Sequence, residues 1–254
     1  MLSYREQLPP PRLAEAVECF WSLTHESASA ITHRVMPDGC ADILFMRSPN
    51  VTTLFAVGAM TRFEDFEVHP GHELVGVRFR AGMWRAHIGI PGERITDRRT
   101  PLEDLWGARA RTLRERLGEA RSPEACMATL SDAMPTVAAR TPVQRAFAWM
   151  ESVHGCVTVD DIARHAGLSP RQFRRVCLDH TGLSPKLLAQ VLRFRHAASR
   201  VHMHAGDHAG LSIDCGYFDQ SHFIAEFQRF SGRAPGASWR SSATNDVAGG
   251  VHVR

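Results

Sequence analysis

The fold is decided by the stretch Gly167-Leu168-Ser169-Pro170-Arg171-Gln172-Phe173-Arg174-Arg175-Val176-Cys177. Ser169 has the side chain of a helix N-cap, and Pro170 suits the first helical position, where no partner for a backbone N–H is available. Gln172 follows Ser169 by three residues and completes a capping box. The stretch therefore predicts a tight turn and then a helix that begins at Pro170.

This predicted helix has two chemically different faces. Apolar residues at helical spacing form one face, which consists of Phe173, Val176 and Cys177. Arginines with the same spacing form the other face, which consists of Arg171, Arg174 and Arg175. A short helix that buries one stripe and points guanidiniums outward is suited to a DNA groove. A solvated arginine face on an ordinary helix is the alternative.

The neighbouring sequence places this helix in a helix-turn-helix unit. Residues 159–166 predict a preceding helix with acidic residues in its first turn, where they are favourable. Gly182 is a natural C′ residue after the arginine-bearing helix. Ser184 and Pro185 begin a long helix that is predicted to extend to about Met203.

The unit recurs later in the chain at a constant offset. Phe173, Gly182 and Pro185 are matched by Phe223, Gly232 and Pro235. The second copy predicts a short helix over 211–215, a turn at Gly216, and a helix over 220–230 with Asp219 as its cap. Two units joined by one long helix can place two recognition helices in successive major-groove segments, about 34 Å apart. The repeat therefore favours the groove hypothesis for the arginine face.

Positive charge is concentrated in the same half of the chain. The whole protein carries a net charge of +3. Residues 141–254 hold 13 Lys and Arg against 9 Asp and Glu, whereas residues 1–140 hold 17 against 18. A basic half joined to a neutral half indicates a polyanionic partner for one domain only.

Residues 1 to about 100 are rich in strand-like sequence. Short runs separated by turn sequences lie at 31–36, 41–46, 52–57, 63–68 and 73–80. Residues 13–21 form either a short helix or a strand that leads into the sheet. Several short strands at this spacing predict a small barrel or sandwich.

Helical patterns follow over 83–88, 102–117 and 123–139. These helices either supply a dimer interface or pack on their own sheet. The expected fold class is α+β, with a β-rich sensor domain at 1–100, connecting and possible dimerisation helices at 101–140, a DNA-binding domain at 141–240 and a flexible tail at 241–254.

The second unit carries the sequence Cys215-Gly216-Tyr217-Phe218-Asp219-Gln220-Ser221-His222-Phe223, followed by Phe227, Arg229, Phe230, Gly232 and Pro235. Through these residues the chain resembles the AraC/XylS family of bacterial transcription regulators over residues 143–240. The first domain resembles a sensor-type domain found ahead of AraC units, through residues 36–45, 76–80 and 101–107. The resemblance implies a barrel-like (cupin-like) N-terminal domain with flanking helices. It also implies an all-α domain of two helix-turn-helix units, and a transcription regulator rather than an enzyme.

The resemblance implies base contacts from the second helix of each unit. The candidates are Arg171, Gln172, Arg174, Arg175, Gln220, Ser221 and His222. The second copy has Ile224 and Ala225 where the first has Arg174 and Arg175. Because arginine on guanine is the commonest specific contact, we expect the first unit to provide most of the sequence reading. Candidates for phosphate contacts, each with a surface salt bridge as the alternative, are Arg193, Arg195, Arg229 and Arg240.

Family analogy also places a small-molecule effector in the first domain. Candidate pocket residues, with core packing as the alternative for the apolar ones, are Phe20, Trp21, Phe45, Phe55, Arg78 and Arg80. The expected partners are double-stranded DNA, a second copy of the chain and, for an activator, RNA polymerase. A ligand-independent regulator whose first domain only dimerises is a further alternative.

Two histidine-containing groups raise the question of a metal, although no cofactor is expected. One is the patch formed by His202, His204 and His208, in which Gly206 interrupts the helical spacing. The other consists of His33, Asp38 and Cys40, which a cupin-like metal-binding enzyme domain with an accessory DNA-binding module would use. A Pro-Asp-Gly turn and a buried thiol account for the same residues structurally.

The remaining composition indicates a cytoplasmic protein. Residues 1–11 lack the apolar core of a signal peptide, and no run is long and apolar enough to cross a membrane. The six cysteines form no CxxC pair, so we expect reduced, buried thiols.

Overall fold

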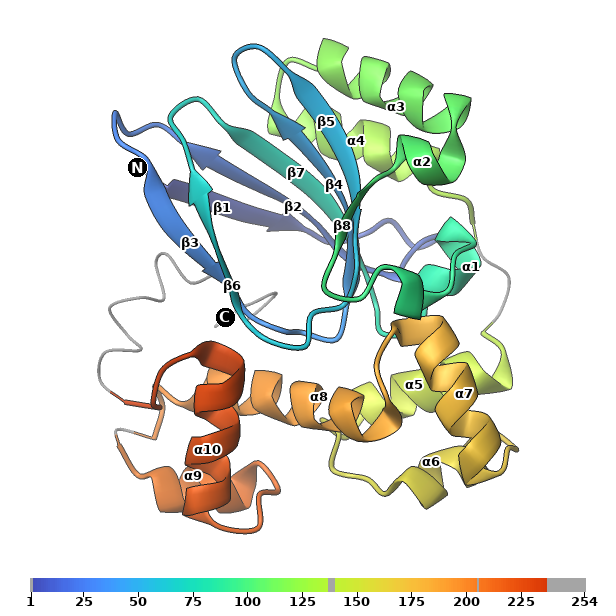
Figure 1. The fold of residues 1–254 in the computed structure, drawn as a ribbon, viewed down its shortest axis with the longest axis vertical. Helices are drawn as coiled ribbons and strands as arrows, with labels where there is room; N and C mark the ends of the chain where they lie inside the picture. Colours follow the sequence, from blue (N-terminus) through green and yellow to red (C-terminus); the bar gives the residue numbers. More distant parts are fainter. Residues whose placement is uncertain (1, 137–139, 205, 237–254) are drawn as a thin grey trace.

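Antiparallel strands build the N-terminal half of the computed structural model, which describes residues 2–136, 140–204 and 206–236 (Figure 1). The main sheet has the strand order β1-β2-β7-β4-β5-β8. Its strands are β1 (Leu2–Gln7), β2 (Val17–His25), β4 (Ala41–Arg47), β5 (Thr52–Val57), β7 (Glu73–Phe79) and β8 (Arg99–Pro101). A separate two-stranded ribbon consists of β3 (Ile31–Val35) and β6 (Glu64–Val68).

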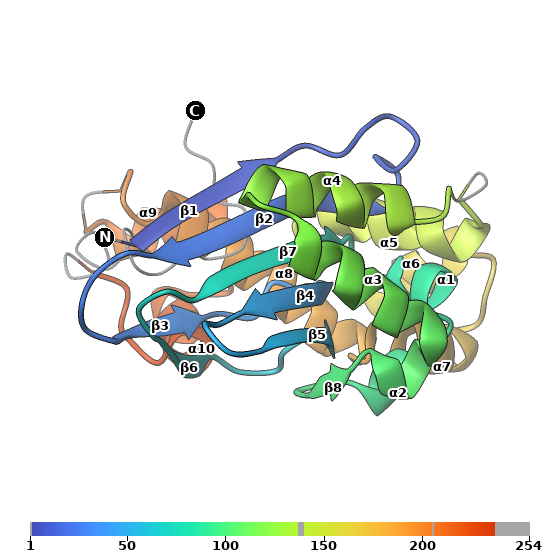
Figure 2. The same ribbon diagram turned by 90° about the horizontal axis from the view of Figure 1, so that it is seen from above.

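Both faces of the main sheet are covered, and strand alternation decides which residue goes to which face. On β7, Val75, Val77 and Phe79 are fully buried on the face that carries the main hydrophobic core. Gly76 and Arg78 alternate with them and therefore lie on the opposite face, which the β3–β6 ribbon covers. The central strands are thus sandwiched between helices on one side and the ribbon on the other (Figure 2).

The sheets do not close into the expected barrel-like fold. The main sheet ends at β1 on one edge and at β8 on the other, and the ribbon strands pair only with each other. A barrel requires every edge strand to find a partner. Here the ribbon closes over one face through side-chain packing instead, with Leu23, Val68 and Leu74 at its centre.

Helices cover the other face of the sheet. They are α1 (Trp84–Ile88), the 3-10 turn η1 (Gly92–Arg94), α2 (Glu103–Trp106), α3 (Ala108–Glu119) and α4 (Pro123–Ala133). The single helix expected over 102–117 is divided at Gly107, whose φ of 57° and ψ of −129° are not helical. Leu113 and Leu117 of α3 and Leu130 of α4 are buried in the sheet core. The buried faces of these helices therefore pack on their own sheet.

The C-terminal half is helical, as predicted. Its helices are α5 (Pro142–Ser152), α6 (Val159–His165), α7 (Pro170–Thr181), α8 (Pro185–Arg200), α9 (His208–Asp214) and α10 (Gln220–Ser231). One core forms around Phe147 and Phe173 of the first unit, and a second forms around Phe223 and Phe227 of the second unit. The long helix α8 contributes to both cores and joins the two units (Figure 1). No helix in the described part of the chain is long and apolar enough to span a membrane.

Candidate nucleic-acid interface and sheet cavity

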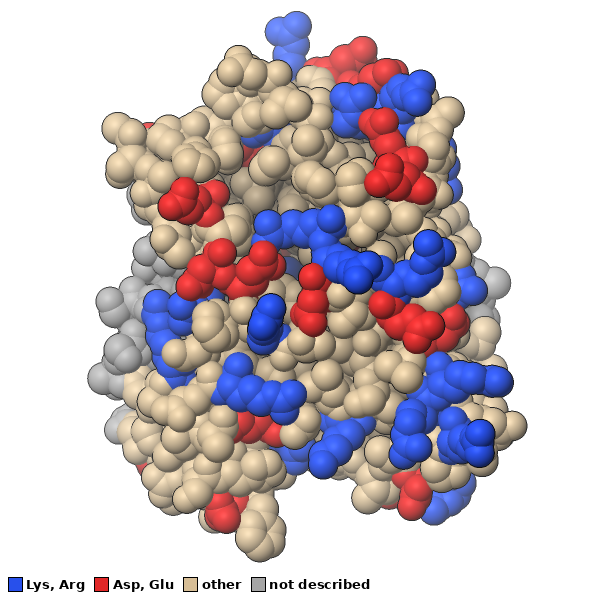
Figure 3. Space-filling model, viewed as in Figure 1, with Lys and Arg blue, Asp and Glu red and all other residues tan. Residues whose placement is uncertain are grey.

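Helix α7 presents its arginine face to solvent. Arg171, Gln172, Arg174 and Arg175 are exposed, while Phe173 is fully buried. The capping box forms as predicted: the side chain of Ser169 accepts a hydrogen bond from the backbone of Gln172, whose own side chain accepts one from the Ser169 N–H at 2.9 Å. Among the described residues, no carboxylate lies at ion-pair distance from any of the three arginines. Lys and Arg gather over α6 and α7, at the lower right of Figure 3.

Helix α10 presents a different set of side chains. Gln220, Ser221 and His222 are exposed at its N-terminal end, where Asp219 caps the helix by accepting the His222 N–H at 2.7 Å. Phe218, which precedes the cap, is 92% exposed. Nothing in the sequence pattern distinguishes Phe218 from its buried aromatic neighbours, so only the structure reveals its exposure.

A groove of about 1200 Å³ separates the two units. One face of α8 contributes Lys186, Gln190 and Arg193 to it, and α6 contributes Arg164 and His165. Arg164 also pairs with Asp161 at 2.8 Å. Lys186 and Arg164 were absent from the sequence-based candidates, because only the packed structure turns them toward the same space as Arg193.

The phosphate-contact candidates have separate environments. Arg193 lies 3.6 Å from Glu226 and donates to the carbonyl of Gly216 at 3.1 Å, so it ties α8 to the second unit. Arg229 is exposed and lies over the Phe230 ring at 4.9 Å. Arg195 points to the opposite side of α8 and pairs with Glu18 of the sheet domain, which removes it from the groove. Arg240 lies outside the described residues.

Both recognition helices end against the sheet domain at equivalent glycines. Gly182 and Gly232 have φ values of 75° and 72°, the left-handed conformation predicted for a C′ residue. Thr96 donates from Oγ1 to the carbonyl of Gly182 at 3.0 Å. Arg34 donates to the carbonyl of Ser231, next to Gly232, at 3.1 Å. The C-terminal ends of α7 and α10 therefore face the sheet domain, and the ends with the candidate base contacts face away from it (Figure 1).

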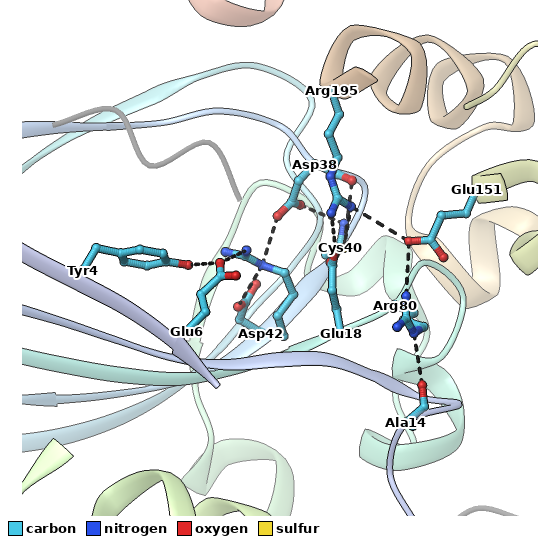
Figure 4. Close-up of polar contacts among 11 residues, drawn as sticks. Tyr4, Glu6, Ala14, Glu18, Asp38, Cys40, Asp42, Arg80, Glu151 and Arg195 are labelled. Atoms are coloured by element: carbon cyan, nitrogen blue, oxygen red, sulfur yellow. Dashed lines mark hydrogen bonds and ion pairs between the residues drawn. The ribbon is translucent and has the colours of Figure 1, made fainter. Parts of the chain in front are cut away.

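A buried polar cluster joins α8 to the sheet domain (Figure 4). Arg195 forms a short ion pair with Glu18 of β2, and Cys40 donates from its thiol to the same carboxylate at 3.3 Å. Burial raises the pKa of Glu18, but the guanidiniums of Arg195 and Arg78 more than offset this and hold the pKa below its ordinary value. Burial also raises the pKa of Cys40, so its thiol stays neutral.

Arg78 continues this cluster into the sheet domain. Its Nε lies 3.1 Å from a carboxylate oxygen of Asp38 and 3.6 Å from one of Asp42, and its Nη1 lies 3.7 Å from Glu6. Asp42 also accepts the indole N–H of Trp21 at 2.8 Å. Burial raises the pKa of Asp42 to about 7, because the opposing effect of Arg78 is smaller than the cost of desolvation.

The Arg78 cluster lies at one end of a cavity of about 380 Å³ between the main sheet and the β3–β6 ribbon. Asp38, Asp42 and Arg78 line the cavity together with apolar side chains from both layers. Trp21 reaches into it because its strand partner is Gly76: a Cβ at that position would lie 2.4 Å from the indole ring.

The candidate pocket residues divide by the face they occupy. Trp21, Phe55 and Arg78 line the cavity. Phe20 and Phe45 are buried in the core on the other face of the sheet, so for these two the core-packing alternative holds. Arg80 follows the end of β7 and lies 3.7 Å from Glu151 of α5, outside the cavity.

The histidine-containing groups are used in other contacts. His33 packs edge-on against Phe66 at 5.1 Å, while Asp38 and Cys40 belong to the polar cluster. His204 lies 3.8 Å from Asp214, and His208 packs against Phe223. Within 2–136, 140–204 and 206–236, no three His, Cys, Asp or Glu side chains are arranged to hold a metal ion. All six cysteines are free thiols, and Cys156 alone is exposed, contrary to the expectation that all are buried.

Two sequence families match separate parts of the chain. Residues 5–101 match a domain of unknown function, DUF6597. Residues 162–241 match a family described as a helix-turn-helix domain. A search of curated proteins gave no match.

Several solved structures are similar to the chain. The DNA-binding domain of AdpA, a global transcriptional factor solved in complex with a target DNA, is 22% identical, with 41% of this chain and 96% of that chain covered and a TM-score of 0.38. A transcriptional regulator with an AraC-type DNA-binding domain from Chromobacterium violaceum is 22% identical, with 40% and 90% covered and a TM-score of 0.36. ToxT from Vibrio cholerae is 12% identical, with 87% and 98% covered and a TM-score of 0.45.

Proposed function

We propose that the chain is an AraC-type DNA-binding transcription regulator, and that a small molecule bound in its sheet domain controls how it binds DNA. Within this proposal, α7 and α10 enter successive major-groove segments of one operator. The cavity between the main sheet and the β3–β6 ribbon receives the effector. The contacts between the two domains carry the response from the cavity to the recognition helices.

One observation supports α7 as the main sequence-reading helix. Its arginines Arg171, Arg174 and Arg175 are exposed and have no carboxylate partner among the described residues. An ordinary solvated face would gain little from three unpaired like charges at helical spacing, because like charges one turn apart repel. Guanidiniums held on a rigid helix with free donors are suited to the paired acceptors of guanine.

The other proposed contacts come from α10 and from the groove between the two units. Gln220, Ser221 and His222 read bases in the second segment, and the exposed ring of Phe218 contacts a thymine methyl group there. Lys186, Arg164 and Arg193 in the groove, together with Arg229, contact phosphates and set the position of the protein on DNA. Arg195 has no part in the interface because Glu18 holds it on the other side of α8.

The effector proposal rests on the continuity between cavity and helix α8. Asp38 lines the cavity and pairs with Arg78, and two residues later the Cys40 thiol contacts Glu18, the partner of Arg195. A ligand that moves Asp38 therefore changes the support of α8, from which both helix-turn-helix units extend. A second copy of the chain, and RNA polymerase for an activator, complete the proposed assembly.

Fluorescence anisotropy with labelled duplexes tests the regulator. Duplexes from the region upstream of the gene compete with random duplex of equal length at moderate salt, because salt suppresses the sequence-independent part of binding. We expect at least one upstream duplex to bind about 1000-fold more tightly than random DNA. Equal competition by all duplexes would contradict a sequence-specific regulator.

A further inference from the structure

We propose that the cavity of the sheet domain takes an organic cation: a compact apolar group that carries an ammonium or a similar positively charged head. This inference rests on the proposed use of the cavity as the effector site and names the chemical class of the effector. It comes from three features of the cavity: the charge at its buried end, the charge compensation of its arginines, and the aromatic character of its walls.

The buried end of the cavity holds more carboxylates than guanidiniums. Asp38 and Asp42 line it and share the single guanidinium of Arg78, at 3.1 Å and 3.6 Å. A carboxylate oxygen of Glu6 also lies 3.7 Å from the guanidinium of Arg78. Taking charges out of water is costly unless they are compensated, so a cation placed beside Asp38 and Asp42 completes the cluster. An anionic head at the same place would add a further negative charge.

The second arginine on the cavity wall is also compensated. Arg99 lies 2.9 Å from Glu64, and both residues line the cavity. Among the described lining residues, Arg78 and Arg99 are the only arginines and no lysine is present. A ligand carboxylate or phosphate would therefore have to displace an existing ion pair before it found a cationic partner.

The walls suit the apolar part of such a ligand. Trp21 and Tyr4 stack on each other with ring centroids 6.2 Å apart, and both line the cavity beside the acidic end. Aromatic faces attract cations as well as apolar groups. Phe55, Phe66 and Leu44 add further apolar surface. A volume of about 380 Å³ limits the ligand to a small molecule and falls within the usual range of ligand sites.

Three matched probes separate charge from shape: 3-phenylpropylamine, 3-phenylpropanol and 3-phenylpropionate, which place a cationic, a neutral and an anionic head on the same apolar body. Isothermal titration calorimetry measures their binding to the full-length protein. Anisotropy measures whether each probe changes the affinity for operator DNA. We expect the amine to bind at least tenfold more tightly than the alcohol, and the propionate to bind more weakly than the alcohol.

Variants assign the preference to the proposed residues. Asp42→Asn and Asp38→Asn keep the oxygen that accepts the Trp21 and Cys40 N–H groups but remove the charge. Each should reduce the advantage of the amine over the alcohol at least fivefold and leave alcohol binding within twofold. Asp104→Asn, the same change on an exposed side chain of α2, should alter nothing. Leu44→Trp fills the cavity and should abolish binding of all three probes, and thermal unfolding checks that each variant folds.

The outcomes distinguish the ligand class from the proposed function. Tighter binding of the propionate or the alcohol, or an amine preference that survives both Asp→Asn changes, overturns the organic cation. If such a probe also changes DNA affinity, effector control stands without this ligand class. If the amine binds as expected and leaves DNA affinity unchanged, the ligand class stands and effector control fails. If no probe binds the wild-type protein more tightly than Leu44→Trp, both are rejected.

Discussion

The same residue type performs three different tasks in this protein, and the partners of each guanidinium decide which. Arg171 is exposed and has no carboxylate partner among the described residues. Arg195 is held between the domains by Glu18, and Arg78 is buried among the carboxylates of Glu6, Asp38 and Asp42. The guanidinium of an arginine is always charged in proteins. Its role therefore depends on burial and pairing rather than on protonation.

Removing the α7 arginines should relax sequence preference. Arg171→Ala and Arg175→Ala each remove a guanidinium able to pair with guanine, a contact worth about 1–3 kcal/mol of discrimination. We expect operator affinity to fall by about 5- to 100-fold in anisotropy titrations, with little change for random duplex.

Two further variants serve as comparisons for the α7 arginines. Arg229→Ala removes a proposed phosphate contact and should weaken all duplexes alike, with a shallower salt dependence. Arg121→Ala removes the same charge from an exposed position in the sheet domain and should leave binding unchanged. Equal losses on operator and random DNA for Arg171→Ala would contradict its role in base reading.

Asp42 should make stability depend on pH. The ordinary pKa of an Asp side chain is about 3.8, and burial raises the pKa of Asp42 to about 7 in the folded protein. There its carboxylate faces Arg78, Asp38, Glu18 and the Trp21 indole. Between these values the folded chain binds more protons than the unfolded chain, so the free energy of unfolding falls as pH rises from about 4 to about 7.

Asp42→Asn removes this dependence. Its melting temperature, relative to wild type, should be higher at pH 8 than at pH 5. Asp104→Asn should show no such trend, and parallel pH profiles for wild type and Asp42→Asn would contradict the shift.

The two recognition helices end at equivalent glycines, Gly182 and Gly232, but each glycine contacts a different part of the sheet domain. Gly182 meets η1, where a Cβ would lie 2.1 Å from the Thr96 hydroxyl and 2.8 Å from the Gly92 carbonyl. Gly232 meets Phe63, at 2.6 Å from the ring. Each glycine therefore ends a recognition helix and also allows the sheet domain to approach it. The orientation of α7 and α10 is thus fixed at the ends opposite the candidate base contacts.

Substitution of Gly182 should separate these two effects. Gly182→Ala introduces left-handed strain of about 1 kcal/mol and a clash with the backbone of Gly92. Gly167→Ala introduces similar strain at φ 69°, with no atom within 4 Å of the new Cβ. In urea unfolding we expect Gly182→Ala to cost at least about 2 kcal/mol more than Gly167→Ala. It should also increase hydrogen exchange in η1. Equal losses for the two variants would mean that the contact with the sheet domain contributes nothing.

The whole molecule is a pair of domains that meet at helix α8 and at the C-terminal ends of α7 and α10. One face of α8 lines the groove with Lys186 and Arg193, and the other packs on the sheet domain, where Leu188 approaches Gly39 and Arg195 pairs with Glu18. The groove and the cavity thus lie on opposite sides of the same helix. The Asp38–Cys40 turn therefore contacts the helix that joins the two helix-turn-helix units.

A double-mutant cycle on Glu18 and Arg195 measures this connection. Glu18→Gln or Arg195→Gln alone leaves a buried charge without its main partner and should cost about 3–5 kcal/mol in urea unfolding. The double variant should cost at least about 1 kcal/mol less than the sum of the two, because the residues interact directly. The same cycle on the exposed pair Arg5 and Glu124, 3.2 Å apart, should give a much smaller coupling. Additive losses for Glu18 and Arg195 would contradict a buried interdomain pair.

The residue pattern was sufficient for the local features of the chain. The cap at Ser169 and the C′ glycines depend on interactions between residues close in sequence. The apolar runs and turn residues that mark strands β3 to β7 are also local signals, so all of these were predicted within a few positions. Strands β1 and β8 were missed because β1 lies at the start of the chain and β8 has three residues, too few for a pattern. The alternation along β7 could have assigned Phe20 and Phe45 to the core face had the register with β2 and β4 been known.

Tertiary contacts determined which way side chains point, how the strands pair and where the cavity lies. Arg193 and Arg195 are two residues apart on one helix, yet one faces the groove and the other faces Glu18, which is 177 positions away in sequence. The open sheet, the cavity beneath the ribbon and the cluster around Arg78 all depend on strands that pair out of sequence order. Such contacts are specified by packing over the whole chain and leave no short-range signature. The arginine-bearing helix that predicted DNA binding from its own residues is thus oriented by contacts that only the complete fold supplies.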